Sequence, residues 1–159
     1  MWVTNASPLI LLGKIGEIDL ISRLGTPIAV PEGVAAELRA GPPGDPARVW
    51  IEGSGAGWVA PVERIDPLIA TWDLGIGESH VLTLCRMLPG AEAILDDRAA
   101  RNCAVTLSIR VRGTLSLIVL AKRKGLIRDA KALFQGLLDH GIRVAPDVIE
   151  TALRLAGER

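Results

Sequence analysis

The chain has 159 residues, of which 49% are hydrophobic and 23% are charged, a balance typical of one compact folded domain spanning residues 1–159. This composition excludes a disordered chain. Eighteen basic and eighteen acidic residues cancel, which excludes a generally basic surface for nucleic acid, so any such binding needs a local patch.

Short apolar runs alternate with helical patterns through the first 62 residues. Ser7 followed by Pro8 is a typical helix start, and Glu37 lies on an apolar helical face. The pattern predicts a strand over 1–4, one helix or two over 9–24, a strand over 28–30, a helix from Pro31, a short helix over 46–52 and an edge strand over 58–62.

Residues 74–101 form the most informative stretch: a glycine-rich turn, a helix, a Pro-Gly break, a buried strand and the start of another helix. Glu78 lies on the apolar stripe of the first helix, where an inward carboxylate needs a partner. The strand over 91–95 ends in Asp96 and Asp97, adjacent carboxylates that repel each other and favour a cation. The apolar stripe itself consists of Val81, Leu84, Cys85 and Leu88.

Arg98 and Arg101 fall in the first turn of the next helix, where the helix dipole disfavours cations. They either neutralise the two aspartates or hold an anion. Further along, Val105, Leu107, Ile109 and Val111 alternate with polar residues, which predicts a strand with one wet face. The remaining pattern predicts a helix that is apolar nearly all round over 115–121, a helix over 129–140, a short strand or extended link over 142–145 and a last helix from Pro146.

Strands that alternate with helices predict an α/β fold with a mainly parallel sheet. Ligands of such sheets gather outside the carboxyl ends of the strands. Asn5 ends the first strand, and Asp96 and Asp97 end the fourth. Glu37 and Glu78 lie on helices whose apolar faces should dock on the sheet, so this arrangement allows the four places to converge.

A cluster of carboxylates without histidine or cysteine ligands suits a hard cation such as Mg²⁺ or Mn²⁺. Such an ion can generate a nucleophile from water and stabilise the displacement at a phosphodiester. In the absence of metal, crowding of like charges would raise the pKa of at least one carboxyl group in the cluster. A structural role stays open for each acid, because helix caps and pairs with Arg98 and Arg101 produce the same pattern.

Other candidate groups point to no further site. We expect His80 and His140 to be ordinary surface histidines, and Cys85 and Cys103 to be reduced core thiols, with a disulfide between them as the alternative. No apolar run is long enough to span a bilayer and no signal peptide opens the chain, so we expect no membrane partner and a cytoplasmic location.

The chain resembles PIN-domain proteins, the fold of the VapC-type toxin ribonucleases, and most of all an uncharacterised prokaryotic branch of that superfamily. The matching stretches appear in family order and cover most of the chain: VTNASPLI at 3–10, VPEGVAAEL at 30–38, LGIGES at 74–79, ILDDRAAR at 94–101 and GTLSLIVLAKRKGLI at 113–127.

The resemblance implies a three-layer α/β/α domain with the activity of an endoribonuclease that depends on Mg²⁺ or Mn²⁺. It assigns the acidic pocket to position 5, Glu37, Glu78 and the Asp96-Asp97 pair, with Asp97 matching the family's aspartate-arginine step best. Glu37, Glu78 and Asp97 would hold the metal, Asp96 would support it, and Asn5 would orient a water or the metal.

Position 5 departs from the family pattern, because Asn5 replaces the usual first aspartate and removes one negative charge from the site. One alternative is therefore a PIN module that binds RNA or protein without cleavage. Another is a different metal-dependent phosphohydrolase on an α/β scaffold.

The expected partners follow from charge and from the resemblance. RNA would contact a local patch formed by Arg98, Arg101, Arg110 and Arg112, with the Lys122–Lys124 run less favoured. The apolar segment 115–121 and the resemblance both favour a homodimer. If the protein is a toxin, the resemblance implies a small antitoxin protein as its partner.

Overall fold

One sheet of five parallel strands forms the centre of the computed structural model, which describes residues 1–159. The strand order is β3-β2-β1-β4-β5. Asn5 directly follows the central strand, so it lies in the middle of the sheet's carboxyl edge. The strands are β1 (Trp2–Thr4), β2 (Ile28–Pro31), β3 (Val59–Ala60), β4 (Glu92–Ile94) and β5 (Arg110–Arg112).

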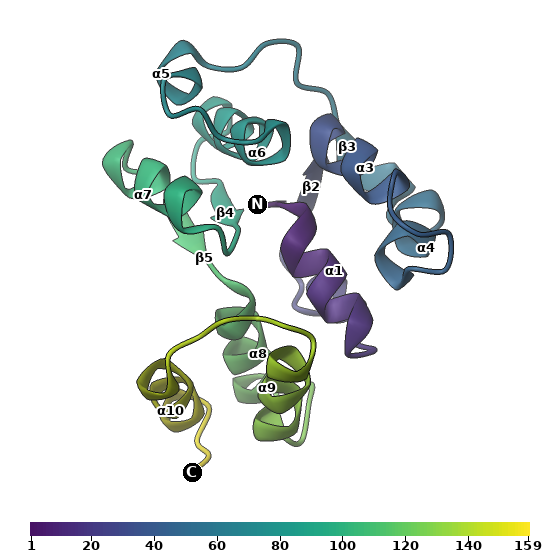
Figure 1. The fold of residues 1–159 in the computed structure, drawn as a ribbon, viewed down its shortest axis with the longest axis vertical. Coiled ribbons are helices and arrows are strands. Elements are labelled where there is room, and N and C mark those ends of the chain that lie inside the picture. The colour runs from purple at the N-terminus through teal and green to yellow at the C-terminus, as the bar shows by residue number, and fades with distance from the viewer.

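Helices cover both faces of this sheet, which confirms the predicted three-layer α/β/α architecture. Figure 1 shows α5, α6 and α7 on one side and α1 and α4 on the other, and α3 contacts both groups. The helices are α1 (Ala6–Lys14), α2 (Leu20–Arg23), α3 (Glu32–Arg39), α4 (Pro46–Glu52), the 3-10 segment η1 (Ala56–Trp58), α5 (Pro67–Ala70), α6 (Ile76–Met87), α7 (Arg98–Thr106), α8 (Thr114–Arg123), α9 (Ala130–Asp139) and α10 (Pro146–Leu155).

The main hydrophobic cluster surrounds the sheet. Every residue of β1 and β2 is buried, because a parallel sheet covered by helices on both faces leaves neither side chain direction exposed to water. None of the ten α-helices has the length and apolar content needed to cross a bilayer.

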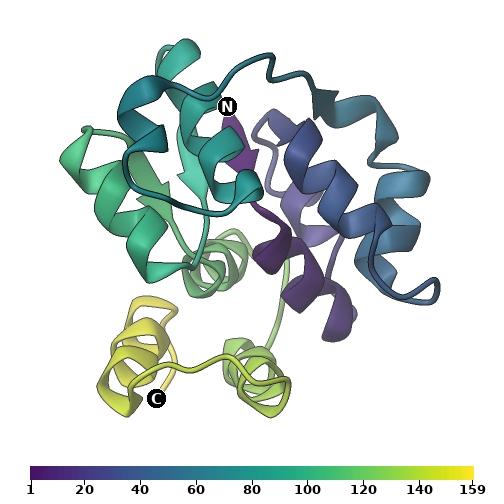
Figure 2. The same cartoon turned by 45° about the horizontal axis from the view of Figure 1, so that its top comes forward.

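A second, smaller hydrophobic cluster lies between α8, α9 and α10, which group at the end of the molecule away from α3 (Figure 2). Leu117 and Ala121 of α8 belong to the main cluster, whereas Ile118 belongs to the second. The nearly all-round apolar character of 115–121 is therefore explained within one chain. The members of the second cluster are Ile118, Ala130, Phe134, Leu137, Ala152, Leu153 and Ala156.

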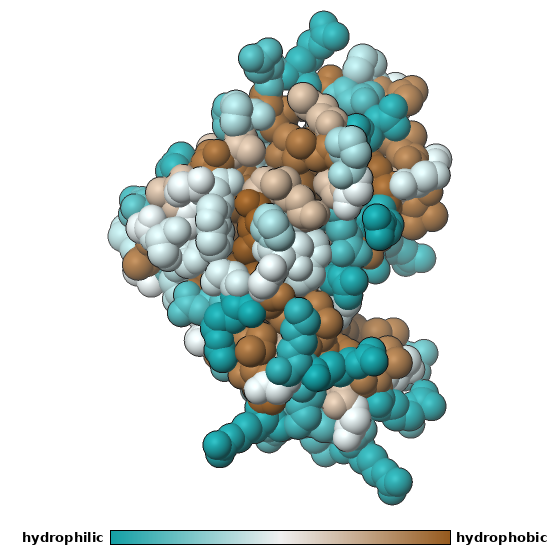
Figure 3. All heavy atoms as spheres, turned by 180° about the vertical axis from the view of Figure 1, so that it is seen from behind, coloured by the Kyte–Doolittle hydropathy of each residue, from teal (hydrophilic) through white to brown (hydrophobic).

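Viewed from behind, the C-terminal helices form a smaller lobe that a notch separates from the main body on one side (Figure 3). Hydrophobic surface is visible on this lobe. The same lobe has an apolar pocket between α8 and α10, lined by Leu115, Val119, Val148 and Leu155 among others.

The strand predicted over 105–111 is wrong in its first half. Helix α7 continues to Thr106, and β5 covers only Arg110–Arg112. Val105 is 69% exposed, because the helical stripe of α7 buries Ala100, Cys103 and Ala104 instead. An alternation over seven residues is too short to distinguish the period of a strand, two residues, from that of a helix, 3.6 residues. Burial in the folded chain then favours the helix.

The structure also decides two smaller predictions, one for the start of the first helix and one for residues 142–145. The first helix begins at Ala6, with Asn5 rather than Ser7 as its N-cap. Of the two possibilities predicted for residues 142–145, a short strand or an extended link, the structure shows the link: no strand forms there, and Figure 2 shows an extended linker between α9 and α10.

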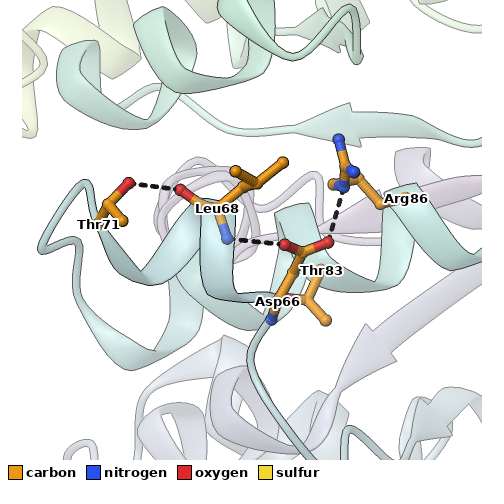
Figure 4. A network of polar contacts seen from close by, with 5 residues as sticks. All are labelled: Asp66, Leu68, Thr71, Thr83 and Arg86. Atoms are coloured by element: carbon orange, nitrogen blue, oxygen red, sulfur yellow. Dashed lines mark hydrogen bonds and ion pairs between the residues drawn. The ribbon is translucent and has the colours of Figure 1, made fainter.

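A polar network anchors α5 on α6 (Figure 4). Asp66 accepts hydrogen bonds from the Leu68 backbone N–H at 2.8 Å and from Arg86 Nε at 2.7 Å, and its own N–H donates to Thr83 Oγ1 at 3.1 Å. The Leu68 N–H, followed by Arg86, holds the pKa of Asp66 below its usual value. This network fixes the connection that leads into the start of α6.

Candidate functional site

Three oxygen-bearing side chains meet beyond the carboxyl end of β1, where α3 and α6 approach each other. Asn5 Nδ2 donates to Glu78 Oε1 at 3.2 Å. Asn5 Oδ1 and Glu37 Oε2 each lie 3.1 Å from the point that a Cβ atom on Gly77 would occupy. The structure thus brings Asn5, Glu37 and Glu78 together, as the sequence predicts. Asn5 and Glu78 are 73 positions apart in the chain.

Asn5 has an unusual combination of burial and unused bonding capacity. It is 3% exposed, and its Oδ1 is the one buried side-chain polar atom without a hydrogen-bond partner. Asparagine at an N-cap ordinarily accepts from a first-turn N–H, but Asn5 makes no such bond to α1. An unpaired buried acceptor costs about 1–3 kcal/mol, so this oxygen points to a cation or donor ligand.

Glu37 and Glu78 face an open pocket between α3 and α6, lined by Gly33, Ala36, Glu37, Gly75, Ile76, Gly77 and Glu78. Partial burial of the Glu37 carboxyl group raises its pKa above the ordinary value, and the nearby charge of Glu78 raises it further. Burial is the larger cause of this rise in pKa, and the repulsion from Glu78 is the part that corresponds to the predicted crowding of like charges.

The glycines of the 74–77 turn provide space for these carboxylates. A Cβ on Gly75 would lie 2.5 Å from Glu78 Oε2, which is too close for any other residue without a shift. Gly75 and Gly77 thus leave room for the side chains of Glu78, Glu37 and Asn5, and the Gly-Ile-Gly sequence lacks the remainder of a phosphate-binding glycine motif.

Asp96 is held by the start of α8. Its two oxygens accept hydrogen bonds from the Thr114 backbone N–H at 2.8 Å and from Thr114 Oγ1 at 2.6 Å. The end of β4, two residues before Asp96, lies beside Asn5, because the Asn5 N–H donates to Ile94 O at 2.9 Å.

Asp97 is the N-cap of α7 and accepts from the Ala100 N–H at 2.9 Å, with its side chain exposed. No group of three or more His, Cys, Asp or Glu side chains is close enough to hold a metal ion. The shared cluster expected for Glu37, Glu78 and Asp97 is therefore not assembled in this structure. Sequence could not separate these cases, since a capping aspartate and a ligating aspartate both follow a strand end.

The four candidate RNA-binding arginines lie in different surroundings. Arg98 is exposed, and Arg101 donates from Nη1 to Leu95 O at 3.1 Å. Neither forms an ion pair with Asp96 or Asp97. These two arginines stay at the carboxyl edge of the sheet, near the candidate site.

Arg110 and Arg112 are placed less favourably than the sequence suggests. Arg110 opens β5, at the amino edge of the sheet. Arg112 donates to Glu92 Oε1 at 3.3 Å and to Ser116 Oγ at 3.1 Å, and it lies over the Trp2 ring at 6.0 Å. Arg112 is thus engaged within the chain.

His80 is a residue whose surroundings the sequence prediction missed. It is half-buried rather than at the surface, and its Nδ1 accepts from the Gly33 backbone N–H at 3.0 Å. The one sequence signal for this contact is its position three residues after Gly77, on the part of α6 that meets α3. His140 is exposed, as expected.

Both cysteines are buried and free, which agrees with reduced core thiols. Burial raises the pKa of Cys85 to about 12, and it also raises the pKa of Cys103. A raised pKa disfavours the thiolate, which is the form of cysteine that acts as a nucleophile or metal ligand.

A family model described as PIN domain matches residues 1–158. Searches of curated proteins and of solved structures each found no match. PIN domains are generally nucleases and typically use divalent metal ions. The predicted resemblance is confirmed over nearly the whole length: the chain belongs to the PIN-domain family.

Proposed function

We propose that the chain is an endoribonuclease that depends on Mg²⁺ or Mn²⁺. The observation that carries the proposal is the buried, unpaired Oδ1 of Asn5, which lies beside the carboxylates of Glu37 and Glu78. Protein Mg²⁺ sites commonly use one or two carboxylates and complete the coordination with water and substrate phosphates. Two carboxylates and one amide oxygen therefore fit a hard cation.

The residues of the site divide into those that would hold the ion and those that would support it. Asn5, Glu37 and Glu78 would hold the ion, and the Nδ2–H of Asn5 orients Glu78 before any ion binds. When bound, such an ion supplies charge stabilisation at phosphate oxygens and a lower pKa for an attacking water. Asp96 and Asp97 retain supporting roles at the neighbouring strand end, where they would orient water or substrate.

The proposed biological role rests on the resemblance to VapC-type toxins. On that basis the chain acts as the toxin of a toxin–antitoxin pair, with RNA as substrate, a small protein as antitoxin and a second copy as dimer partner. Sedimentation at micromolar concentration tests the dimer, and a monomer there contradicts it.

A second candidate function is a PIN module that binds RNA without cleaving it. Two observations favour it: the neutral amide at position 5 and the absence of a group of three acids close enough to hold a metal. A site with two carboxylates binds a divalent ion more weakly than one with three or four.

Cleavage of end-labelled single-stranded RNA, titrated with Mn²⁺, separates the two functions. The nuclease proposal expects Mn²⁺-dependent cleavage that Glu78→Gln abolishes and that Glu63→Gln, at an exposed loop position, leaves intact. RNA binding without cleavage at any Mn²⁺ concentration supports the binding module. Hydrolysis of phosphomonoesters without RNA cleavage would instead indicate a different phosphohydrolase.

A further inference from the structure

Helices α3 and α6, which carry the two carboxylates, interlock through a pair of glycines. A Cβ on Gly33 of α3 would lie 2.7 Å from His80 Nδ1 and 2.9 Å from Ile76 Cγ2, both on α6. A Cβ on Gly77 of α6 would lie 3.1 Å from Glu37 Oε2 on α3. Each glycine thus lies against side chains of the opposite helix, and the spacing of the helices depends on this fit.

A hydrogen bond from backbone to side chain fixes the same interface. The N-cap of α3 is Pro31, which offers no side-chain acceptor to the first turn. The Gly33 N–H is one of the first-turn donors that have no partner within the helix. His80 Nδ1 accepts it at 3.0 Å, so a side chain of α6 caps α3.

The position of this bond relates it directly to the carboxylates. Gly33 and Glu37 are four residues apart and therefore lie on one face of α3, one turn from each other. On α6, His80 follows Glu78 by two residues. The bond thus ties the backbone that carries Glu37 to the helix that carries Glu78.

We propose that His80 is a positioning residue for the cation site: by capping α3 from α6, it sets the separation between Glu37 and Glu78. This inference rests on the proposed function, because it concerns the cation that the site binds. A plain helix cap would contribute to stability without changing the affinity of the site for metal, and the experiment separates these two roles.

The test is isothermal titration of Mn²⁺ into the wild-type chain, His80→Leu and His80→Asn. Leucine removes the acceptor, whereas asparagine places its Oδ1 where His80 has Nδ1. We expect His80→Leu to weaken Mn²⁺ binding by about 10- to 100-fold, the usual effect of losing a group that orients a ligand. We expect His80→Asn to restore most of the affinity. Hydrogen exchange of the Gly33 amide should accelerate in the leucine variant alone.

Asp129→Ala is the matched control. It removes the cap of α9, where Asp129 Oδ1 accepts from the Ala132 N–H at 2.9 Å, in the C-terminal lobe. It should lower the melting temperature and leave Mn²⁺ affinity unchanged.

Wild-type affinity in a folded His80→Leu protein overturns the inference and leaves the proposed function standing. Failure of His80→Asn to restore affinity while the Gly33 amide is protected also overturns it. If His80→Leu does not fold, His80→Gln replaces it in the titration, because the acceptor oxygen of glutamine lies one bond further from the backbone than His80 Nδ1. Weakened Mn²⁺ binding by His80→Gln supports the inference, and unchanged binding overturns it. A wild-type chain that binds no Mn²⁺ overturns both proposals.

Discussion

Asn5 Nδ2 donates a hydrogen bond to Glu78 Oε1 at 3.2 Å, while the side-chain oxygen Oδ1 of Asn5 has no partner. Asn5→Asp should reverse this relationship, because a carboxylate replaces the donor beside Glu78. We expect the variant to be less stable without metal by about 1–3 kcal/mol and to bind Mn²⁺ more tightly. Thermal denaturation with and without Mn²⁺ measures both effects.

The control for this change is Asn102→Asp, at an exposed position of α7. It should alter neither metal-free stability nor the Mn²⁺ response. If Asn5→Asp melts like the wild type without metal and gains no stability from Mn²⁺, the three side chains do not form a cation site.

Glu37→Gln should change how stability depends on pH. Because the pKa of Glu37 is raised in the folded state from an ordinary value of 4.5, the folded chain binds this proton more tightly than the unfolded chain. The free energy of unfolding should therefore fall as pH rises from about 4.5 through the raised pKa. Glu37→Gln should abolish that fall, matching the wild type at low pH and exceeding its stability above the window.

Urea denaturation across this pH range provides the measurement, with Glu32→Gln as a comparison on the same helix. Glu32 is an exposed first-turn acid, so its amide loses a favourable dipole interaction and should lower stability slightly at neutral pH. Equal behaviour of the two variants would remove the argument for crowding at Glu37.

Two substitutions at Asp97 separate its capping role from a role in metal binding. Asparagine caps helices about as well as aspartate, so Asp97→Asn should keep the stability of the metal-free chain, whereas Asp97→Ala should lose about 0.5–2 kcal/mol. Chemical denaturation measures these differences. Loss of Mn²⁺ affinity in Asp97→Asn would assign it a part in the metal site, and wild-type affinity would leave it only the cap.

The double variant Arg98→Ala/Arg101→Ala should weaken RNA binding about equally for different sequences. Its affinity should also depend less steeply on salt, the slope changing by about 0.7 for each phosphate of a single strand that the variant no longer neutralises. Fluorescence anisotropy over a range of salt concentrations measures both quantities. Arg110→Ala, at the opposite edge of the sheet, is the matched control, and a larger effect there would move the RNA to that edge.

Local signals predicted much of the fold because their physical causes are local. The short helix predicted over 46–52 forms with these bounds, with Pro46 in its first turn and Asp45 as its N-cap. Asp129 likewise caps α9. The strand expected over 105–111 failed because burial of Cys103 and Ala104 depends on packing that the local pattern does not encode.

In the candidate site too, some contacts could be predicted from local sequence and others depend on packing. Glu78 could be predicted because a carboxylate on an apolar helical stripe is costly without a partner. Glu37 is an exposed residue of α3 rather than part of its buried face, so its assignment to the site rests on the family resemblance. The hydrogen bond between His80 and Gly33 joins residues 47 positions apart, and it exists only because two glycines let the helices approach. The two hydrogen bonds from Thr114 to Asp96 also depend on how the elements pack. The sequence does not show this partner, so the sequence analysis assigned Asp96 a supporting role at the metal.

The division of the hydrophobic interior into two clusters has a spectroscopic consequence. All four tryptophans belong to or pack against the cluster around the sheet: Trp2, Trp50, Trp58 and Trp72. The chain has no tyrosine, and α8, α9 and α10 contain Phe134 as their one aromatic residue. Tryptophan emission therefore follows the melting of the sheet region alone, whereas far-UV circular dichroism registers every helix. Coincident curves would mean that the two clusters melt as one cooperative unit, and an earlier dichroism transition would mark the C-terminal lobe as a separately melting unit.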